Sequence, residues 1–281
     1  MICIGVGNEG ASAGHTAGIL KENTEERIPL AVQMKETAIN VQIWKSYHDI
    51  VDISLISPAG VQIGPIPEVI GTQRFVVGDT EILLYYGEPS PFHVSQEIFI
   101  EFLPKDSYIT PGIWQFVLTP RKIVTGEYDL WLPSENVLNR GTAFRYPTER
   151  GTLTIPSTSQ RVISVGAYDS LTFAYADFSG RGGLEGESKP DLVAPGVDIT
   201  APTPSGIYQT FTGTSFATPF VSGAAALMME WGIVRGNDPY LYGEKVKAYL
   251  RRGARPLPGF TEYPNPQVGY GALCLRDSLP L

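Results

Sequence analysis

The stretch GTSFATPFVSGAAALMMEW, residues 213–231, places Ser215 among small residues, directly before a run that is apolar on nearly every side. A helix that is apolar all round is normally buried, so this run predicts a buried helix from Ser215 to about Trp231. Pro219 would fall in the first turn of that helix, where its missing N–H costs little. Gly223 and the three alanines after it would let another backbone approach closely.

The position of Ser215 suits nucleophilic chemistry. A serine hydroxyl is a weak nucleophile near neutral pH and needs an adjacent base. At a helix N-terminus, unpaired backbone N–H groups and the positive end of the dipole favour the negative charge of a developing oxyanion. Serine is also a favoured N-cap residue, and the local pattern leaves that alternative open.

The composition indicates a folded chain without a nucleic-acid footprint. Of its 281 residues 43% are hydrophobic and 18% charged, and the formal net charge is −8. Its densest basic group (Arg251, Arg252 and Arg255) lies near the end of an expected amphipathic helix, where cations suit the dipole. No apolar run reaches 18 residues, so we expect no membrane span. Cys3 and Cys274 are expected to be buried free thiols.

The chain changes character twice along its length. Residues 1–18 read as a short apolar strand and a loop rich in Gly, Ser and Ala. In residues 19–150, strand-like runs recur between turn-rich breaks, and residues such as Ile98 and Ile100 share one face, which favours an antiparallel sandwich or jelly roll. Residues 151–281 return to mixed α/β. We therefore expect one α/β domain in two segments and a β insert between them.

Four segments resemble subtilisin-like serine proteases (peptidase S8, the subtilases), in the order of that family. GTSFATPFVSGAAAL resembles the serine motif, and ICIGVGNEG resembles the strand and loop that carry the oxyanion asparagine, here Asn8. LTIPSTSQRVISVGAYDS resembles the stretch from a cis-proline, here Pro156, into the next strand. KPDLVAPGVDI resembles the loop before the serine motif. Together with the C-terminus, these segments cover a little over half of the chain.

The resemblance implies a fold and a set of site residues. The fold is α/β, the later part of a subtilisin-like parallel sheet with a buried serine helix, interrupted by an antiparallel β-sandwich or jelly-roll insert. Ser215 would be the nucleophile and Asn8 an oxyanion donor, with Gly7, Gly213 and Thr214 lining the oxyanion and substrate-binding region. Loss of one such donor costs roughly 10²–10³ in turnover. The alternative for Asn8 is an ordinary Asn-Glu-Gly turn, and no metal or cofactor is expected.

The base and its orienting carboxylate are not found in this sequence. In the family, the Asp and His motifs precede the asparagine loop, which here starts at residue 5. We therefore expect Asp and His on a missing N-terminal segment or a second chain, and expect this chain alone to be inactive. His15 follows the asparagine loop and is interpreted as a loop histidine near the site entrance, while His48 and His93 belong to the insert. Asp191 is interpreted as structural.

The insert narrows the resemblance to the Csp germination proteases of clostridia and related bacterial subtilases. Those proteins activate the zymogen of a cortex-degrading enzyme, and some are inactive pseudoproteases. This implies a serine endopeptidase with a protein or peptide substrate, associated with the spore or cell, and with neither nucleic acid nor membrane as a partner. One alternative is an inactive pseudoprotease or scaffold that binds through the insert. A weaker one is a carbohydrate-binding face with Trp44, Trp114 and Trp131.

Overall fold

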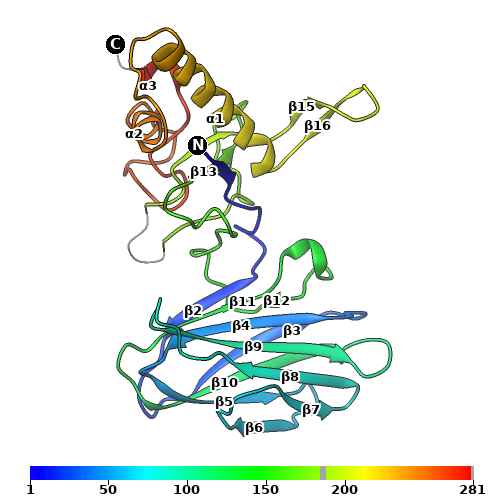
Figure 1. Cartoon of the computed structure of the whole chain (residues 1–281). Coiled ribbons are helices and arrows are strands. Elements are labelled where there is room, and N and C mark those ends of the chain that lie inside the picture. The colour runs from blue at the N-terminus through cyan, green and yellow to red at the C-terminus, as the bar shows by residue number, and fades with distance from the viewer. Residues whose placement is uncertain (184–187, 280–281) are drawn as a thin grey trace. The chain divides into compact units, whose positions relative to one another are not determined.

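The structure is a computed structural model that describes residues 1–183 and 188–279. It divides into two compact units (Figure 1). Unit 1 comprises Met1–Ala11 and Glu149–Leu281, and unit 2 comprises Ser12–Thr148.

The first boundary between the units lies earlier than the sequence suggests. The pattern predicts an insert from residue 19, whereas unit 2 begins at Ser12. The reason is strand β2 (His15–Ile19), which pairs with β11 (Glu127–Trp131) at the edge of a unit 2 sheet. The Gly- and Ala-rich composition around β2 reads as a loop, and only this long-range pairing makes it a strand.

The core of unit 1 is a parallel sheet with the strand order β1-β13-β14. The strands span Cys3–Gly5, Ile163–Tyr168 and Leu192–Pro195. Every residue of β13 is buried, as expected for the central strand of a covered parallel sheet. β1 is an edge strand, since β13 is the one described strand that pairs with it. The sheet agrees with the predicted α/β fold class.

Helix α1 (Thr214–Met229) packs against all three strands of this sheet. A π-helical turn, η2 (Glu230–Val234), extends it. By length and composition alone, the run Thr214–Val234 would be enough to cross a membrane. One face packs on the sheet, but Phe220 and Leu227 are exposed, so the prediction of a helix buried on all sides is wrong. The residues buried on the packed face are Ala217, Val221, Ala224, Ala225 and Met228.

Pro219 lies in the second turn of α1, not in the first as the sequence predicts. The helix starts one residue early, at Thr214, with Gly213 as its N-cap. Since proline has no N–H, Pro219 cannot donate to the carbonyl of Ser215 one turn before it. The Thr218 hydroxyl donates to the Thr214 carbonyl over 2.9 Å and so satisfies one acceptor of this turn.

The remaining elements of unit 1 surround this core. Helix α2 (Glu244–Arg252) ends at Gly253, and its Val246 and Leu250 are fully buried, as the amphipathic pattern predicts. A short helix, α3 (Leu275–Ser278), follows near the C-terminus. Strands β15 (Ile199–Pro202) and β16 (Tyr208–Phe211) form an antiparallel hairpin that projects from the rest of unit 1 (Figure 1).

Unit 2 is an antiparallel sandwich of two sheets, with strand orders β12-β3-β10-β5-β6 and β2-β11-β4-β9-β8-β7. Strands β3, β4 and β5 alternate between the sheets, as do β9 and β10, so hydrophobic side chains of both sheets meet in one core. The bounds not yet given are β3 Glu26–Val32, β4 Ile39–Ser46, β5 Ile50–Ile56, β6 Gln62–Ile66, β7 Gln73–Val77, β8 Thr80–Tyr86, β9 Ser95–Pro104, β10 Gly112–Lys122, β12 Ala143–Phe144 and the 3₁₀ turn η1 Glu135–Val137.

Alternation along the strands fills the core of the sandwich. Ile98, Ile100 and Phe102 of β9 point inward and are fully buried, as their spacing predicts. Phe102 meets Trp114 of β10 edge to face, with the ring centroids 5.1 Å apart. Trp114 is itself fully buried, so it cannot contribute to an exposed carbohydrate-binding face.

The two ends of unit 2 are adjacent to each other. The Thr148 N–H donates to the His15 carbonyl over 2.8 Å, and the Ala17 N–H donates to the Thr148 hydroxyl over 3.1 Å. The chain therefore enters and leaves this unit at neighbouring positions.

In unit 1, the two chain ends that flank unit 2 are both held by one segment, residues 178–182. The Gly10 N–H donates to the Phe178 carbonyl over 2.8 Å, and the Thr152 N–H donates to the Arg181 carbonyl over 2.9 Å. Both ends of the interrupted unit are thus anchored to the same loop.

Candidate active site

Ser215 is the second residue of α1, and its side chain is exposed. Gly213 precedes the helix with a φ of 149°, in a region that favours glycine. Its N–H donates to the Gly196 carbonyl over 2.8 Å, which anchors the turn between β16 and α1. The first four N–H groups of a helix have no acceptor within it, so the Ser215 N–H is available beside its own hydroxyl. The positive end of the helix dipole lies at the same point.

Asn8 follows β1 in a loop that meets the start of α1. The Thr214 N–H donates to Asn8 Oδ1 over 3.0 Å, and the Thr214 hydroxyl donates to the same oxygen over 3.2 Å. A backbone N–H can only donate, so the amide atom that faces it must be the carbonyl oxygen. Asn8 Nδ2 is therefore directed away from Thr214. It lies beside Gly213, where an added Cβ would be 3.3 Å from this nitrogen.

Thr214 joins this loop to the helix. Its hydroxyl accepts from the Gly7 N–H over 3.2 Å, and the side chain is 2% exposed. Gly7 has a φ of 90°, and a Cβ there would lie 2.5 Å from the side chain of Thr154. The structure thus brings Gly7, Asn8, Gly213 and Thr214 together next to Ser215. The hydrogen bonds of Thr214 escape sequence analysis because they join residues more than 200 positions apart.

Unit 1, which carries Ser215, contains no histidine. All three histidines of the chain belong to unit 2: His15, His48 and His93. His15 is 2% exposed in β2, its Nε2 lies 2.8 Å from Asp129 Oδ1, and its ring stacks on Trp131 at 4.7 Å. The expectation that His15 lies in a loop is therefore wrong, because it belongs to strand β2, whose pairing with β11 buries this side chain.

Asp191 is fully buried where β13, β14 and α2 meet. Its Oδ2 accepts from the N–H and the hydroxyl of Ser164, over 2.6 and 2.9 Å. Its Oδ1 accepts from Arg251 Nε over 2.6 Å, and Lys247 Nζ lies 3.4 Å away. Asp191 thus has a structural role, but it joins distant elements and does not cap its own turn. Arg251 is the ion-pair partner of Asp191, whereas the sequence predicts only a cation that interacts with the dipole at the end of its helix.

Cysteine and metal chemistry find little support in the described part of the chain. Cys3 and Cys274 are free but only half-buried, whereas the sequence predicts buried thiols. Burial raises the pKa of the Cys3 thiol, which reduces its reactivity. Within residues 1–183 and 188–279, no three His, Cys, Asp or Glu side chains are grouped so as to hold a metal ion.

Comparison with known proteins connects these features to one family. Residues 146–271 match the subtilase family, peptidase S8. Serine protease AprX of Bacillus subtilis (strain 168) is 34% identical over 150 residues, and subtilisin of Bacillus pumilus is 42% identical over 78 residues. The solved structure of the Clostridium perfringens CspB protease is 40% identical and covers 99% of this chain, with a TM-score of 0.91.

The chain spans only part of each relative. It covers 32% of AprX, 26% of the Bacillus pumilus subtilisin and 58% of the CspB chain. The matches to AprX and to the subtilisin extend over 46% and 28% of this chain, whereas the likeness to the CspB protease includes unit 2 as well.

Proposed function

Because residues 146–271 of this chain belong to the subtilase family, we propose that the protein works as a serine endopeptidase of the subtilisin type. It hydrolyses peptide bonds of protein substrates through an acyl-enzyme formed on Ser215. The strongest support is the pair of hydrogen bonds from Thr214 to Asn8, which hold an amide donor beside the first turn of α1.

The proposed chemistry uses three groups at the start of α1. The Ser215 hydroxyl attacks the substrate carbonyl carbon while a base accepts its proton, and the carbonyl oxygen becomes an oxyanion. Asn8 Nδ2 and the Ser215 N–H donate to that oxyanion at the positive end of the helix dipole. Thr214 is a positioning residue, since both of its donors occupy Asn8 Oδ1 and so keep Nδ2 turned toward the reaction.

The base and its carboxylate are proposed to come from a segment outside residues 1–281. This is supported by the lack of histidine in unit 1 and by the pairing of buried His15 with Asp129. Such a segment would find two surfaces in unit 1. One is the edge of β1 that no described strand pairs, and the other is the α1 face that exposes Phe220 and Leu227.

The substrate is proposed to be a protein, and specifically a zymogen of the kind that the resemblance to the Csp germination proteases implies. The likeness to the CspB protease over 99% of the chain supports this choice over a general digestive role. Spore germination is the process in which such an activity would act.

Labelling with a fluorophosphonate probe, which reacts with activated serines, tests this proposal. Residues 1–281 are labelled alone, and again together with the part of the CspB chain that lies outside the matched 58%. We expect no labelling of the chain alone and stoichiometric labelling of Ser215 in the mixture. Ser215→Ala abolishes the label. Ser222→Ala is the matched control, because Ser222 is an exposed serine on the same helix, and it keeps the label.

Two results would overturn parts of the proposal. Rapid labelling of Ser215 in the isolated chain would mean that its base lies within residues 1–281. Labelling that survives Ser215→Ala would remove this residue as the nucleophile. In the mixture, Asn8→Leu should slow labelling by about 10²-fold, since it removes one oxyanion donor.

The second candidate is a pseudoprotease or scaffold that binds partners through unit 2. The observation that favours it is again the lack of histidine in unit 1. It predicts no labelling of Ser215 with or without the added segment. An open reading frame directly upstream of the Met1 codon that encodes the Asp and His motifs would favour the enzyme.

A further inference from the structure

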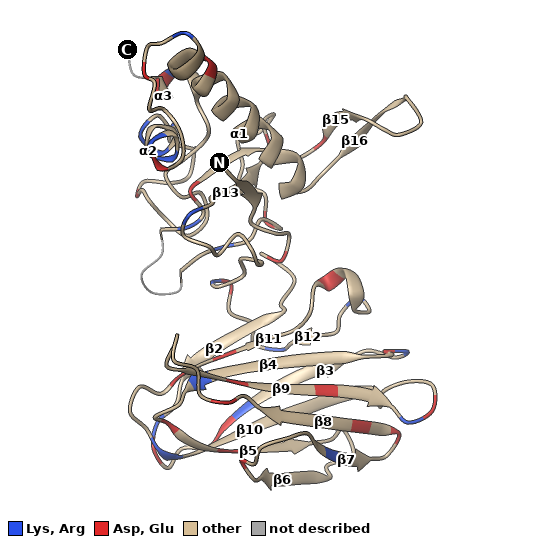
Figure 2. Ribbon diagram, viewed as in Figure 1, with Lys and Arg blue, Asp and Glu red and all other residues tan. Residues whose placement is uncertain are grey.

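Strand β1 separates from β13 just before the loop that carries Asn8. The two strands pair as far as Gly5 and Val165, and the Val6 N–H then donates to the Val165 carbonyl over 3.0 Å. Beyond this point the chain turns away from β13 into the Asn8 loop. Neither strand carries a charged side chain (Figure 2), so neutral groups determine where the two separate.

The hydroxyl of Ser179 takes the next position beside β13. Backbone groups two residues apart in a strand face the same neighbour, so the Ala167 N–H faces the side that β1 has left. Ser179 Oγ accepts from this N–H over 3.0 Å, and the Ala167 carbonyl accepts from the Ala176 N–H over 3.2 Å. Ser179 and Ala167 are both fully buried. The segment from residue 176 to residue 179 therefore replaces β1 as the neighbour of β13.

The same segment holds the Asn8 loop on both sides of the asparagine. The Gly180 N–H donates to the Gly7 carbonyl over 3.0 Å, directly before Asn8. The Gly10 N–H donates to the Phe178 carbonyl over 2.8 Å, two residues after Asn8. The backbone that carries the asparagine is therefore fixed to this segment from both directions.

Tyr175 holds the carbonyl of Ser179 in place. Its hydroxyl donates to that carbonyl over 2.5 Å. The Tyr175 ring is itself packed, with the Phe260 ring at 6.3 Å and the Arg181 guanidinium at 5.6 Å from its centroid. A Cβ on Gly10 would lie 2.2 Å from the same carbonyl oxygen. Since no side chain separates the two backbones, Ser179 cannot shift toward the loop without displacing it.

We propose that Ser179 is a positioning residue for the oxyanion donor Asn8. This inference rests on the proposed function, because it explains how the donor of that reaction is placed. Thr214 sets the rotation of the Asn8 amide, whereas Ser179 sets the position of the backbone that carries it. A donor displaced from the site where negative charge develops slows the reaction while substrate binding is unchanged.

Amide hydrogen exchange, followed by NMR on the whole chain, tests the placement without any activity. Ser179→Ala should speed exchange of the Gly10 and Gly180 amides by about ten-fold relative to the amides of α1, because the segment that fixes them loses its bond to β13. Ser164→Ala is the matched control. Ser164 is a fully buried serine of β13 whose hydroxyl donates to Asp191, so this variant should leave the relative exchange of the two glycine amides unchanged.

Fluorophosphonate labelling of the mixture used to test the proposed function measures the consequence. Ser179→Ala should lower the maximal rate of Ser215 labelling about three- to ten-fold, with the half-saturating probe concentration unchanged. Asn8→Leu already lacks the donor, so adding Ser179→Ala to it should cause no further loss. Tyr175→Phe removes only one hydroxyl and should slow labelling in the same way, which covers the case that Ser179→Ala does not fold. Ser164→Ala should keep the native rate.

Two results would overturn the inference. One is relative exchange at Gly10 and Gly180 that is as slow in Ser179→Ala as in the native chain. The other is a slowing of labelling by Ser179→Ala that is equally large with and without Asn8→Leu, since a positioning residue acts only through the donor. If the native mixture is not labelled at all, the proposed function fails, and the exchange measurement still decides whether Ser179 positions the loop.

Discussion

Replacing Asp191 by asparagine should strongly destabilise unit 1 without changing the shape of the side chain. Both carboxylate oxygens face donors only: Oδ2 faces the N–H and hydroxyl of Ser164, and Oδ1 faces Arg251 and Lys247. An asparagine would have to point its NH₂ group at one of these two sets of donors, whichever way the amide is turned. It would also leave two cations without the buried negative charge between them.

The magnitude follows from the burial of the group. Asp191 is fully buried, and breaking a buried ion pair by removing one partner costs about 3–5 kcal/mol. For a domain of this size each kcal/mol moves the unfolding midpoint by roughly 4 °C. We therefore expect the midpoint of unit 1 in Asp191→Asn to fall by roughly 12 to 20 °C.

Differential scanning calorimetry of the whole chain measures this change, with the transition of unit 2 as an internal reference. The matched control is Asp277→Asn, since Asp277 pairs with Arg255 in an ion pair that is largely solvent-exposed and contributes little. Its midpoint should stay almost unchanged. If Asp191→Asn shifts the midpoint no further than Asp277→Asn, the buried ion pair does not stabilise the unit as argued.

Three further predictions concern other sites. Burial opposes ionisation of Asp49, but hydrogen bonds from residues 124–126 outweigh this effect and lower its pKa. The stability that Asp49 contributes is therefore present above a pH of about 4 and is lost as the pH falls through the pKa of the folded state. Urea unfolding at a series of pH values should show this loss in the native chain and not in Asp49→Asn. Thr214→Val should lower kcat of the active protein about ten-fold with KM unchanged, whereas Thr214→Ser should retain activity. Gly7→Ala should destabilise unit 1 far more than Gly206→Ala in thermal unfolding, because both have positive φ but only Gly7 lacks room for a Cβ.

Features that depend on near neighbours in sequence could be predicted from the sequence. The spacing of Val246 and Leu250 was enough to orient α2, and alternation from Ile98 to Phe102 was enough to orient β9. Apolar composition also revealed α1, but not that Phe220 and Leu227 would be exposed. Hydrophobicity indicates that a face can be buried; it does not indicate whether the chain provides a neighbour to cover it.

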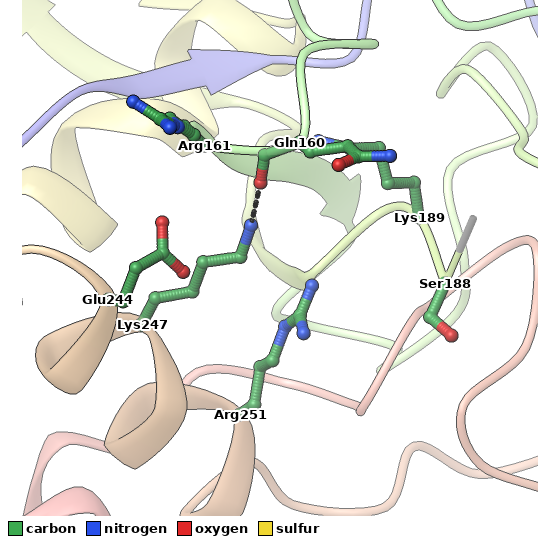
Figure 3. Close-up of a pocket in the computed structure, with 7 residues that line it drawn as sticks. All are labelled: Gln160, Arg161, Ser188, Lys189, Glu244, Lys247 and Arg251. Carbon is green, nitrogen blue, oxygen red and sulfur yellow. Dashed lines mark hydrogen bonds between the residues drawn. The ribbon is translucent and has the colours of Figure 1, made fainter. Parts of the chain in front are cut away.

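The parts that sequence analysis missed depend on contacts between distant residues. Arg251 looked like a cation at a helix end, and its partner Asp191 lies 60 positions away. Residues 160–161, residues 188–189 and helix α2 lie far apart in the sequence but line one pocket (Figure 3), so no local run of residues predicts it. His15 was assigned to a loop because the sequence around it is rich in Gly and Ala. Its strand exists only through pairing with β11, over a hundred residues later.

Because its two ends adjoin, unit 2 is a cassette, that is, a domain that can be inserted or removed as a whole. Loop-closure entropy grows slowly with length, so a domain whose ends already touch can be spliced into a loop at little cost to its host. Residues 178–182 hold both cut ends of the host, at Gly10 and Thr152. A short linker from Ala11 to Glu149 should therefore yield a protein in which β1, β13 and the Asn8 loop keep their places. Because Asn8, Thr214 and Ser215 all belong to unit 1, sequence changes within unit 2 alter none of these three residues.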